Sequence, residues 1–501
     1  MDRSAYLDHL VDTRVGMGKY YYLMSLALGS LFIADVCHIN ATGFLALNMK
    51  SEFGASELDV AILSCFFLAG LCMGALLTGV FTHYYGLKIP MIASALGVVF
   101  LDMLTSFAFD TVSLTCAWTL MGVALGFIGP LCNTMLSEVT PRPYRTMVFY
   151  VTGAFFAVGN LVLAGFVHVI FGGIKSGDWR FFLRVISSLA VVSAVIIHLL
   201  VKDSFRALII KKRVNEGVDV LNHIGKCNHG ESFQEITFDE KMEINEWLNG
   251  IYAARRIEEG PKILVQSPLL RITFSIFSVY FLKDLLTYGF SLYLPTILKK
   301  LELNNPVKEE QGLLVVSLAE FPALFIPILM IDRETFGRKG TFTLFSALAA
   351  ALILYMYILE DRSVIILGFM WCFCQVPSKI VPFLATEYYP TNVRAWALGF
   401  GACIGRLGAL ISPFMTLYLL EGSIFNLFLL YGVAMIFMGA AVAYLPYETR
   451  GRPLDQVLEM EEATQSGGSF RTPNAKSILD SAQKDTPSDI RHSRYRDDVS
   501  V

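Results

Sequence analysis

The sequence contains Glu138-Val-Thr-Pro141-Arg142-Pro-Tyr-Arg145 and, far downstream, Glu387-Tyr-Tyr-Pro390-Thr-Asn-Val-Arg394. In both segments a proline follows the acid at the third position and an arginine follows it at the seventh. Each segment lies at the end of a long apolar run. A carboxylate at a helix end can pair with an arginine beyond a proline turn, and such a pair can open when helices move. The repeat predicts two equivalent halves with a gating ion pair in each; ordinary interfacial charge is the alternative interpretation.

The apolar runs around these motifs have the length of membrane crossings. The chain has 501 residues, of which 54% are apolar and 17% charged, whereas soluble domains carry about 25% charged residues. One crossing needs roughly 20 apolar residues. The first six runs are Tyr20–Leu47, Leu58–Thr82, Pro90–Phe109, Val112–Leu136, Met147–Phe171 and Phe181–Val201. The next six are Leu270–Leu298, Leu313–Ile331, Thr341–Leu359, Val364–Thr386, Ala395–Leu420 and Phe425–Leu445. We predict an all-α membrane protein with twelve transmembrane helices in two six-helix halves.

Charge sets the expected domain organisation. Basic residues precede the first run and flank the polar segment between the two halves, as with Arg14, Lys19, Lys202 and Lys262. Basic loops stay on the cytoplasmic side. We therefore expect a cytoplasmic N-terminus over residues 1–19, an N-terminal six-helix bundle over 20–201, a cytoplasmic linker over 202–268, a C-terminal six-helix bundle over 269–445 and a disordered cytoplasmic tail over 446–501.

Composition also argues against several classes of protein. The formal net charge is -3 and the basic residues are not interleaved with aromatics, so we expect no nucleic-acid partner. The 9 cysteines have neither metal-ligand nor disulfide-framework spacing. No loop gathers a nucleophile, a base or a metal cluster, so we predict that the chain is not an enzyme and uses no metal or cofactor. We expect a monomer in the lipid bilayer, in a plasma or an intracellular membrane.

Further motifs carry a family resemblance. They are Asp178-Trp-Arg180, Lys202-Asp-Ser-Phe-Arg206, Leu221-Asn-His-Ile-Gly-Lys-Cys-Asn228, Thr287-Tyr-Gly-Phe-Ser-Leu-Tyr-Leu-Pro-Thr-Ile-Leu298 and Tyr447-Glu-Thr-Arg-Gly-Arg-Pro-Leu454. With the repeated motif they resemble the major facilitator superfamily, especially its organic-ion, synaptic-vesicle-protein-related and sugar-porter branches. The resemblance implies a secondary transporter that moves a small organic solute by alternating access. A non-transporting sensor derived from a transporter and a sugar or organic-cation carrier are the alternatives.

The loops of this family carry a charge motif that differs between the two halves. The second half contains Asp332, Arg333, Arg338 and Lys339 around a glycine, whereas the first-half copy reads His83-Tyr-Tyr-Gly-Leu-Lys88. The first copy lacks the acid and its adjacent base. The resemblance implies a charge latch at each loop, and the missing acid puts the first latch in doubt. This loss keeps the sensor alternative open.

An ionisable side chain at bilayer depth costs at least ~2.5 kcal/mol and is therefore a candidate functional group. Asp35 lies midway along the first run, and His38 shares its face of the helix. The resemblance implies that an acid here can serve proton coupling, so the proton is the candidate coupling ion. The arginine that often partners it in the fourth helix is replaced by Trp118. A structural Asp bonded to neighbouring hydroxyls is the alternative.

Other polar residues interrupt the apolar runs of the second half. Lys283 and Asp284 are adjacent and point about 100° apart on a helix, so we expect each to find a different neighbour, in a cavity or in an ion-pair network. Lys379, with Gln375 on its face, either lines a cavity or extends toward the membrane surface. The remaining candidates are Glu320 and Asn133. The glycosylation sequon at Asn40 lies inside the first helix, where no glycan can be added.

Arg406 is the candidate for solute binding. At ~1.5 Å per residue its backbone lies roughly 18 Å beyond Arg394, too deep for its side chain to reach the surface easily. A guanidinium there favours an anion. In the branch that the chain resembles, this position tends to be basic in carriers of organic anions. We predict that Arg406 holds a carboxylate; an internal salt bridge to Glu320 or Asp284 is the alternative.

Overall fold

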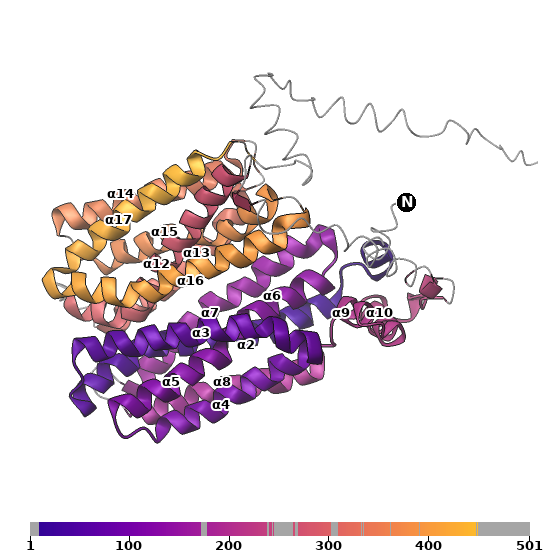
Figure 1. Cartoon of the computed structure of the whole chain (residues 1–501), viewed down its shortest axis with the longest axis horizontal. Coiled ribbons are helices and arrows are strands. Elements are labelled where there is room, and N and C mark those ends of the chain that lie inside the picture. The colour runs from indigo at the N-terminus through magenta and orange to yellow at the C-terminus, as the bar shows by residue number, and fades with distance from the viewer. Residues whose placement is uncertain are drawn as a thin grey trace, which may run out of the picture.

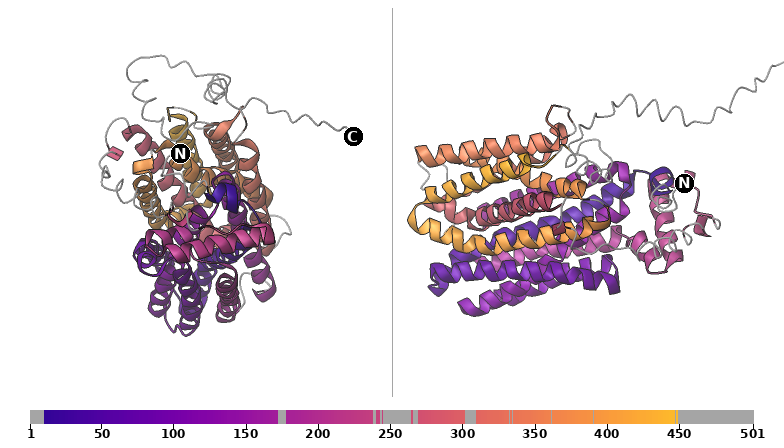
Figure 2. Two further views of the ribbon diagram at one scale, coloured as in Figure 1. Left: turned by 90° about the vertical axis from the view of Figure 1, so that its right-hand side faces the viewer. Right: turned by 45° about the horizontal axis from the view of Figure 1, so that its top comes forward.

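The computed structural model describes residues 10–171, 178–237, 240–242, 244, 264–265, 269–301, 309–331, 333, 335–360, 362–389, 391–446 and 448. Every regular element within these ranges is helical. The long helices run roughly parallel to one another, in two groups that lie side by side (Figure 1, Figure 2).

The first group precedes the linker. It consists of α2 (Lys19–Phe53), α3 (Glu57–Tyr85), α4 (Lys88–Ser106), α5 (Thr111–Gly126), α6 (Ile128–Val139), α7 (Arg145–Phe171) and α8 (Trp179–Leu200). Helices α5 and α6 form one crossing that is interrupted at Phe127. The cause is Pro130, which has no N–H to donate to the carbonyl of Gly126.

The second group follows the linker. It consists of α12 (Leu270–Lys300), α13 (Glu309–Met330), α14 (Gly337–Leu359), α15 (Val364–Tyr388), α16 (Thr391–Gly422) and α17 (Ile424–Ala443). Ten stretches among the described residues are long and apolar enough to cross a bilayer. In α13 only the shorter stretch Gly312–Pro327 is apolar, and α12 carries charged residues at its centre. The predicted all-α, twelve-crossing membrane fold is confirmed.

The helices begin where the sequence offers caps. Ser56 and Asp59 form a capping box at the start of α3, and Asp110 and Ser113 form one at the start of α5. These side chains satisfy backbone N–H groups that have no partner inside the helix. Close packing of α3 on α5 depends on glycine: a Cβ at Gly122 would overlap the carbonyl of Phe67. Large apolar side chains such as those of Phe100 and Leu199 are exposed on the outside of the bundle, where they meet lipid.

A small assembly covers one end of the bundle, here called the linker end. It contains η2 (Val11–Val15), α9 (Phe205–Ile210), α10 (Val214–His229) and η4 (Gly230–Ser232), and Figure 1 shows α9 and α10 beyond the ends of the long helices. The chain turns at Lys211–Arg213 between α9 and α10, where Lys212 has a positive φ of 63°. The domain boundaries and the cytoplasmic assignment of this end stay predictions.

Candidate functional site

The two groups of helices meet along α2 with α12, α3 with α16, and α7 with α13. Midway along these helices, polar side chains from both groups point into the interface. Burial in such a place costs free energy unless the polar groups find partners. The partners that each group finds define the candidate site.

Arg406 on α16 lies at the centre of this region. Its Nη1 donates to the hydroxyl of Tyr288 on α12, and its guanidinium carbon lies 5.4 Å from the centre of that ring. The charge of Arg406 also interacts with Asp284 on α12 and with Asp35 on α2, in the other half. Asp284 is one of the salt-bridge partners that the sequence suggested; Asp35 is a further neighbour that it did not.

Lys283 and Asp284 pair with each other, which corrects the expectation that each would find a different neighbour. The Nζ of Lys283 lies 2.5 Å from Oδ1 of Asp284. The two side chains leave the helix about 100° apart, but the long lysine stem can bend around the helix to reach the short acid. Because Arg406 also interacts with Asp284, this carboxylate lies between two cations.

His38 on α2 pairs with Asp102 on α4. Its Nε2 lies 2.8 Å from Oδ2 of Asp102, and both side chains are fully buried. Its Nδ1 lies 2.6 Å from the carbonyl oxygen of Ala34. A carbonyl only accepts, so Nδ1 carries a proton, and one further proton is shared between Nε2 and the carboxyl. The charge of Asp35 interacts with His38. Oδ1 of Asp35 has no hydrogen-bond partner among the described residues.

A chain of hydrogen bonds crosses the interface from α2 to α15. Asn40 on α2 donates to Oδ1 of Asn160 on α7 at 2.5 Å, and Asn160 donates to Oε2 of Glu320 on α13 at 2.5 Å. Trp371 on α15 donates from Nε1 to Oε1 of Glu320 at 3.0 Å. These residues line a cavity of about 30 Å³, which is room for one or two water molecules.

Sequence reasoning missed Asn40 and Asn160 as site residues. The amide of Asn40 was assigned only to an unusable sequon, and Asn160 is uncharged. A charged side chain in an apolar run is the stronger signal, because burying a charge costs more free energy than burying an amide. A polar amide in the middle of an apolar run is the weaker signal that would have found both.

The other predicted residues of the second half lie near this chain. Lys379 on α15 interacts with the charges of Glu320 and Lys283, and its Nζ lies 5.5 Å from the ring centre of Phe156 on α7. Its ammonium therefore points across the interface rather than toward the membrane surface. Gln375 is buried and lines a small cavity with Lys283 and Trp371. Asn133 on α6 is exposed and is not part of this chain of contacts.

At the linker end of the first half, Glu138 contacts residues of another motif, and its pairing with Arg142 or Arg145 stays a prediction. Its carboxylate accepts a hydrogen bond from Ser204, and its backbone carbonyl accepts from Nε of Arg206 at 2.6 Å. Both partners belong to the motif Lys202-Asp-Ser-Phe-Arg206, which brings them to the end of α6. Arg145 begins α7 and has polar contacts of its own; the side chain of Arg142 lies outside the described residues.

At the same end of the second half, Glu387 pairs with Arg338. Thus the acid of the repeated motif contacts the base of the loop motif in this half. Arg333 is exposed, and its Nε donates to the carbonyl of Leu329 at 3.2 Å. Lys339 donates from Nζ to the carbonyl of Leu445 at 2.6 Å. Asp332 and the side chain of Arg394 lie outside the described residues.

The loop between α3 and α4 and the loop between α13 and α14 each receive a carboxylate from another part of the chain. Asp203 accepts from the backbone N of Leu87 at 2.9 Å, and Glu448 accepts from those of Arg338 and Lys339 at 2.9 and 3.0 Å. Each acid caps the first turn of the helix after the loop, where the helix dipole favours negative charge. The first-half loop therefore has a carboxylate although its own acid is missing. Glu448 lies in the predicted tail, and the rest of that segment beyond residue 446 is outside the described residues.

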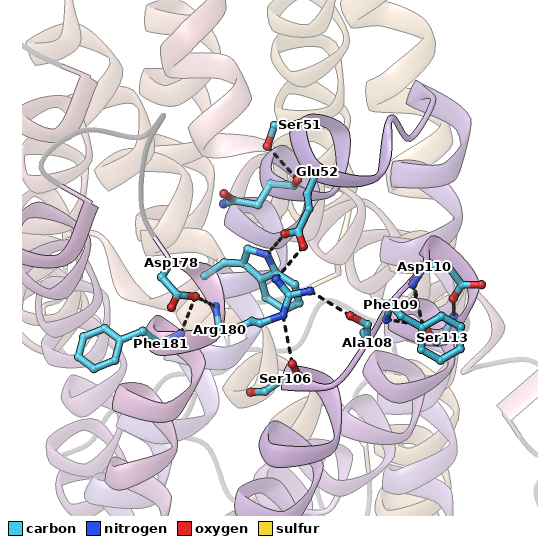
Figure 3. Close-up of polar contacts among 12 residues, drawn as sticks. Ser51, Glu52, Ser106, Ala108, Phe109, Asp110, Ser113, Asp178, Arg180 and Phe181 are labelled. Carbon is cyan, nitrogen blue, oxygen red and sulfur yellow. Dashed lines mark hydrogen bonds and ion pairs between the residues drawn. The ribbon is translucent and has the colours of Figure 1, made fainter.

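At the opposite end of the bundle, Arg180 links three helices of the first half (Figure 3). Its Nη1 donates to Glu52 at 2.7 Å, and its Nε and Nη2 donate to the carbonyls of Ser106 and Ala108 at 3.1 and 3.0 Å. Trp179 donates to the other oxygen of Glu52 at 2.5 Å. The motif Asp178-Trp-Arg180 therefore joins the ends of α2 and α4 to the start of α8.

The same end also carries a larger cavity between the two halves. Its volume is about 670 Å³, and its charged lining residues are Lys50, Glu57, Lys299, Lys300 and Glu421. Small-molecule sites typically have volumes of about 300–1,000 Å³. An organic solute would fit this cavity, here called the outer cavity, whereas the cavity beside Glu320 is large enough only for water. Within the described residues no group of three or more His, Cys, Asp or Glu side chains could hold a metal ion.

Comparison with known proteins agrees with this fold. A family model described as sugar (and other) transporter matches residues 27–460. Organic cation/carnitine transporter 7 of Arabidopsis thaliana is 24% identical over 88% of this chain and 94% of its own. The synaptic vesicle 2-related protein of Xenopus laevis is 25% identical over 88% and 81%. The inward-open xylose transporter XylE of E. coli superposes with a TM-score of 0.67 at 14% identity, over 88% of this chain and 98% of that one. The chain belongs to the sugar (and other) transporter family within the major facilitator superfamily, and is a multi-pass membrane transporter.

Proposed function

We propose that this chain carries a small organic carboxylate across the membrane by alternating access, coupled to a proton. The observation that carries the proposal is the position of Arg406. Its guanidinium lies midway across the bundle, next to Tyr288 and between carboxylates of both halves. A guanidinium can bind a carboxylate through two parallel hydrogen bonds, which favours it over a lysine for this task.

Asp35 is the group that couples transport of the anion to a proton. Asp35 competes with a solute carboxylate for the same guanidinium, because its charge interacts with Arg406 from the other half. A proton on Asp35 removes that competition, so proton and anion would bind together and leave together. This is the arrangement that a symporter needs. One solved structure with the same fold is described as a proton:xylose symporter.

The sensor alternative rested on the missing acid in the first-half loop. Asp203 provides a carboxylate at that loop, so the alternative loses its main support. The organic-cation alternative, which the family resemblance left open, is also in line with the name of the plant relative. It requires the carboxylates near Arg406 to be available to the solute, but Asp284 is already paired with Lys283.

The experiment is uptake of labelled benzoate into proteoliposomes under an imposed proton gradient. Arg406→Ala should weaken benzoate binding by at least ~1.5 kcal/mol, the low end for a bond to a charged group and about tenfold in Kd. Arg406→Lys should recover little of it. Asp35→Asn should retain binding and abolish accumulation driven by the gradient. Uptake that is selective for organic cations, or full benzoate affinity in Arg406→Ala, would contradict the proposal.

A further inference from the structure

Glu320 is a second charged group at the interface, with a sign opposite to that of Arg406. It lies on α13, and it is held from both halves, by Asn160 of α7 and by Trp371 of α15. Lys379 interacts with it through its charge but has no hydrogen bond to it among the described contacts. A carboxylate has about four acceptor sites, and two of them are used here. The carboxylate can therefore accept further hydrogen bonds from a ligand.

The space beside Glu320 suits a positively charged or donor group. The cavity is walled by Phe44 of α2 and by Phe290 of α12, whose ring stacks on Trp371 at 4.1 Å between centres. Aromatic faces attract cations, and more strongly so away from water. Glu320 and Asn160 provide acceptor oxygens on the same cavity. The cavity is small in this structure, so the halves must separate slightly before a ligand group enters.

Arg406 and Glu320 are each next to a residue of α12. Tyr288, which holds Arg406, is three residues from Ser291, which lines the cavity with Glu320. Three residues of helix correspond to about 4.5 Å along its axis. The surroundings of Arg406 and of Glu320 therefore meet α12 at similar depths in the bundle.

We propose that the transported carboxylate is bipolar, with an amino group or another cationic N–H donor at the end opposite to its acid, and that Glu320 binds this second group. The inference rests on the proposed function, because it takes Arg406 as the partner of the acid. It adds the substrate class, an amino acid-like or amino-substituted organic acid, and a specificity-determining role for Glu320.

The test compares two ligands of the same shape. Binding of 4-(aminomethyl)benzoate and of 4-methylbenzoate is measured on the purified full-length protein, at neutral pH, where the amine is protonated. The wild type should bind the amino acid at least tenfold more tightly than the methyl acid. In Glu320→Gln the methyl acid should keep its affinity, which also shows that the variant is folded, and the tenfold preference should disappear. Glu231→Gln, the same change at an exposed carboxylate of η4 outside the helical bundle, should leave both affinities unchanged.

Each other outcome has a defined meaning. Equal wild-type affinity for the two acids would overturn the inference and leave the proposed function standing. Equal weakening of both acids in Glu320→Gln would overturn it too, because Glu320 would then only position the site. Full affinity for both acids in Arg406→Ala would contradict the proposed function, whatever Glu320→Gln does. If neither acid bound the wild type, both would fail.

Discussion

The pair of His38 and Asp102 allows a sharp test of how the bundle tolerates buried polar groups. Both side chains are fully buried, and Nε2 lies 2.8 Å from Oδ2. The other carboxyl oxygen of Asp102 has no partner. Replacing His38 by Leu therefore removes the only side-chain partner that the structure gives this carboxyl. Removing one member of a buried ion pair costs about 3–5 kcal/mol in soluble proteins, so we expect a loss near the low end of that range.

Asp102→Asn should behave differently, because of the proton on Nδ1 of His38. With that proton bonded to the carbonyl of Ala34, a neutral imidazole presents a lone pair at Nε2. The amide NH₂ of an asparagine can donate to it, so the hydrogen bond survives. Hydrogen bonds between membrane helices average about 0.6 kcal/mol, and the loss in Asp102→Asn should stay below about 1 kcal/mol.

The double variant His38→Leu/Asp102→Leu measures the coupling. With both polar groups gone, no buried carboxyl is left without a partner, so the double variant should cost less than the sum of the two Leu variants by about 2 kcal/mol. The assay is equilibrium unfolding of the detergent-solubilised protein, followed by tryptophan fluorescence. Trp118 is a suitable reporter because its Nε1 donates to Thr42 on α2 at 3.0 Å. Additive losses, or Asp102→Asn as costly as His38→Leu, would refute this account of the pair.

Three further predictions concern the two ends of the bundle. Arg180→Ala should lower the free energy of unfolding by about 2 kcal/mol, because it removes charge-assisted hydrogen bonds that include the one to Glu52. Arg180→Lys should restore less than half of this stability in a thermal-shift assay, and full restoration by lysine would show that only the charge matters. Burial raises the pKa of Glu240, but hydrogen bonds from Thr237 and the charge of Arg14 outweigh it and lower the pKa. The contact between Arg14 and Glu240 therefore stabilises the fold above the usual glutamate pKa of about 4.3, and this stabilisation is lost as the pH falls through the lowered pKa. Hydrogen exchange at residues 11–15 should rise at acid pH in the wild type and already at neutral pH in Glu240→Gln, and equal exchange in the two proteins at neutral pH would count against the contact. A tag after Val501 should survive protease added outside sealed cells, and its cleavage there would reverse the predicted orientation.

The crossings and their grouping could be predicted from the sequence because their signals are local. A run of apolar residues long enough for a bilayer forms a helix wherever it occurs, since its backbone groups must bond internally. The repeated motif also indicated the two halves by a local signal, because its residues are neighbours in the chain. Even the close packing at Gly122 follows from the small residue itself.

Only the tertiary structure decided which polar groups meet. His38 turns to Asp102 on another helix, Asn160 joins Asn40 to Glu320 across the interface, and Asp203 replaces the missing acid of a distant loop. These pairings depend on the rotation and depth of each helix relative to its neighbours. Helices that are apolar on nearly all sides carry little periodic signal for that rotation. The sequence therefore determined which polar side chains interrupt the membrane crossings, and packing determined which of them are buried and what their partners are.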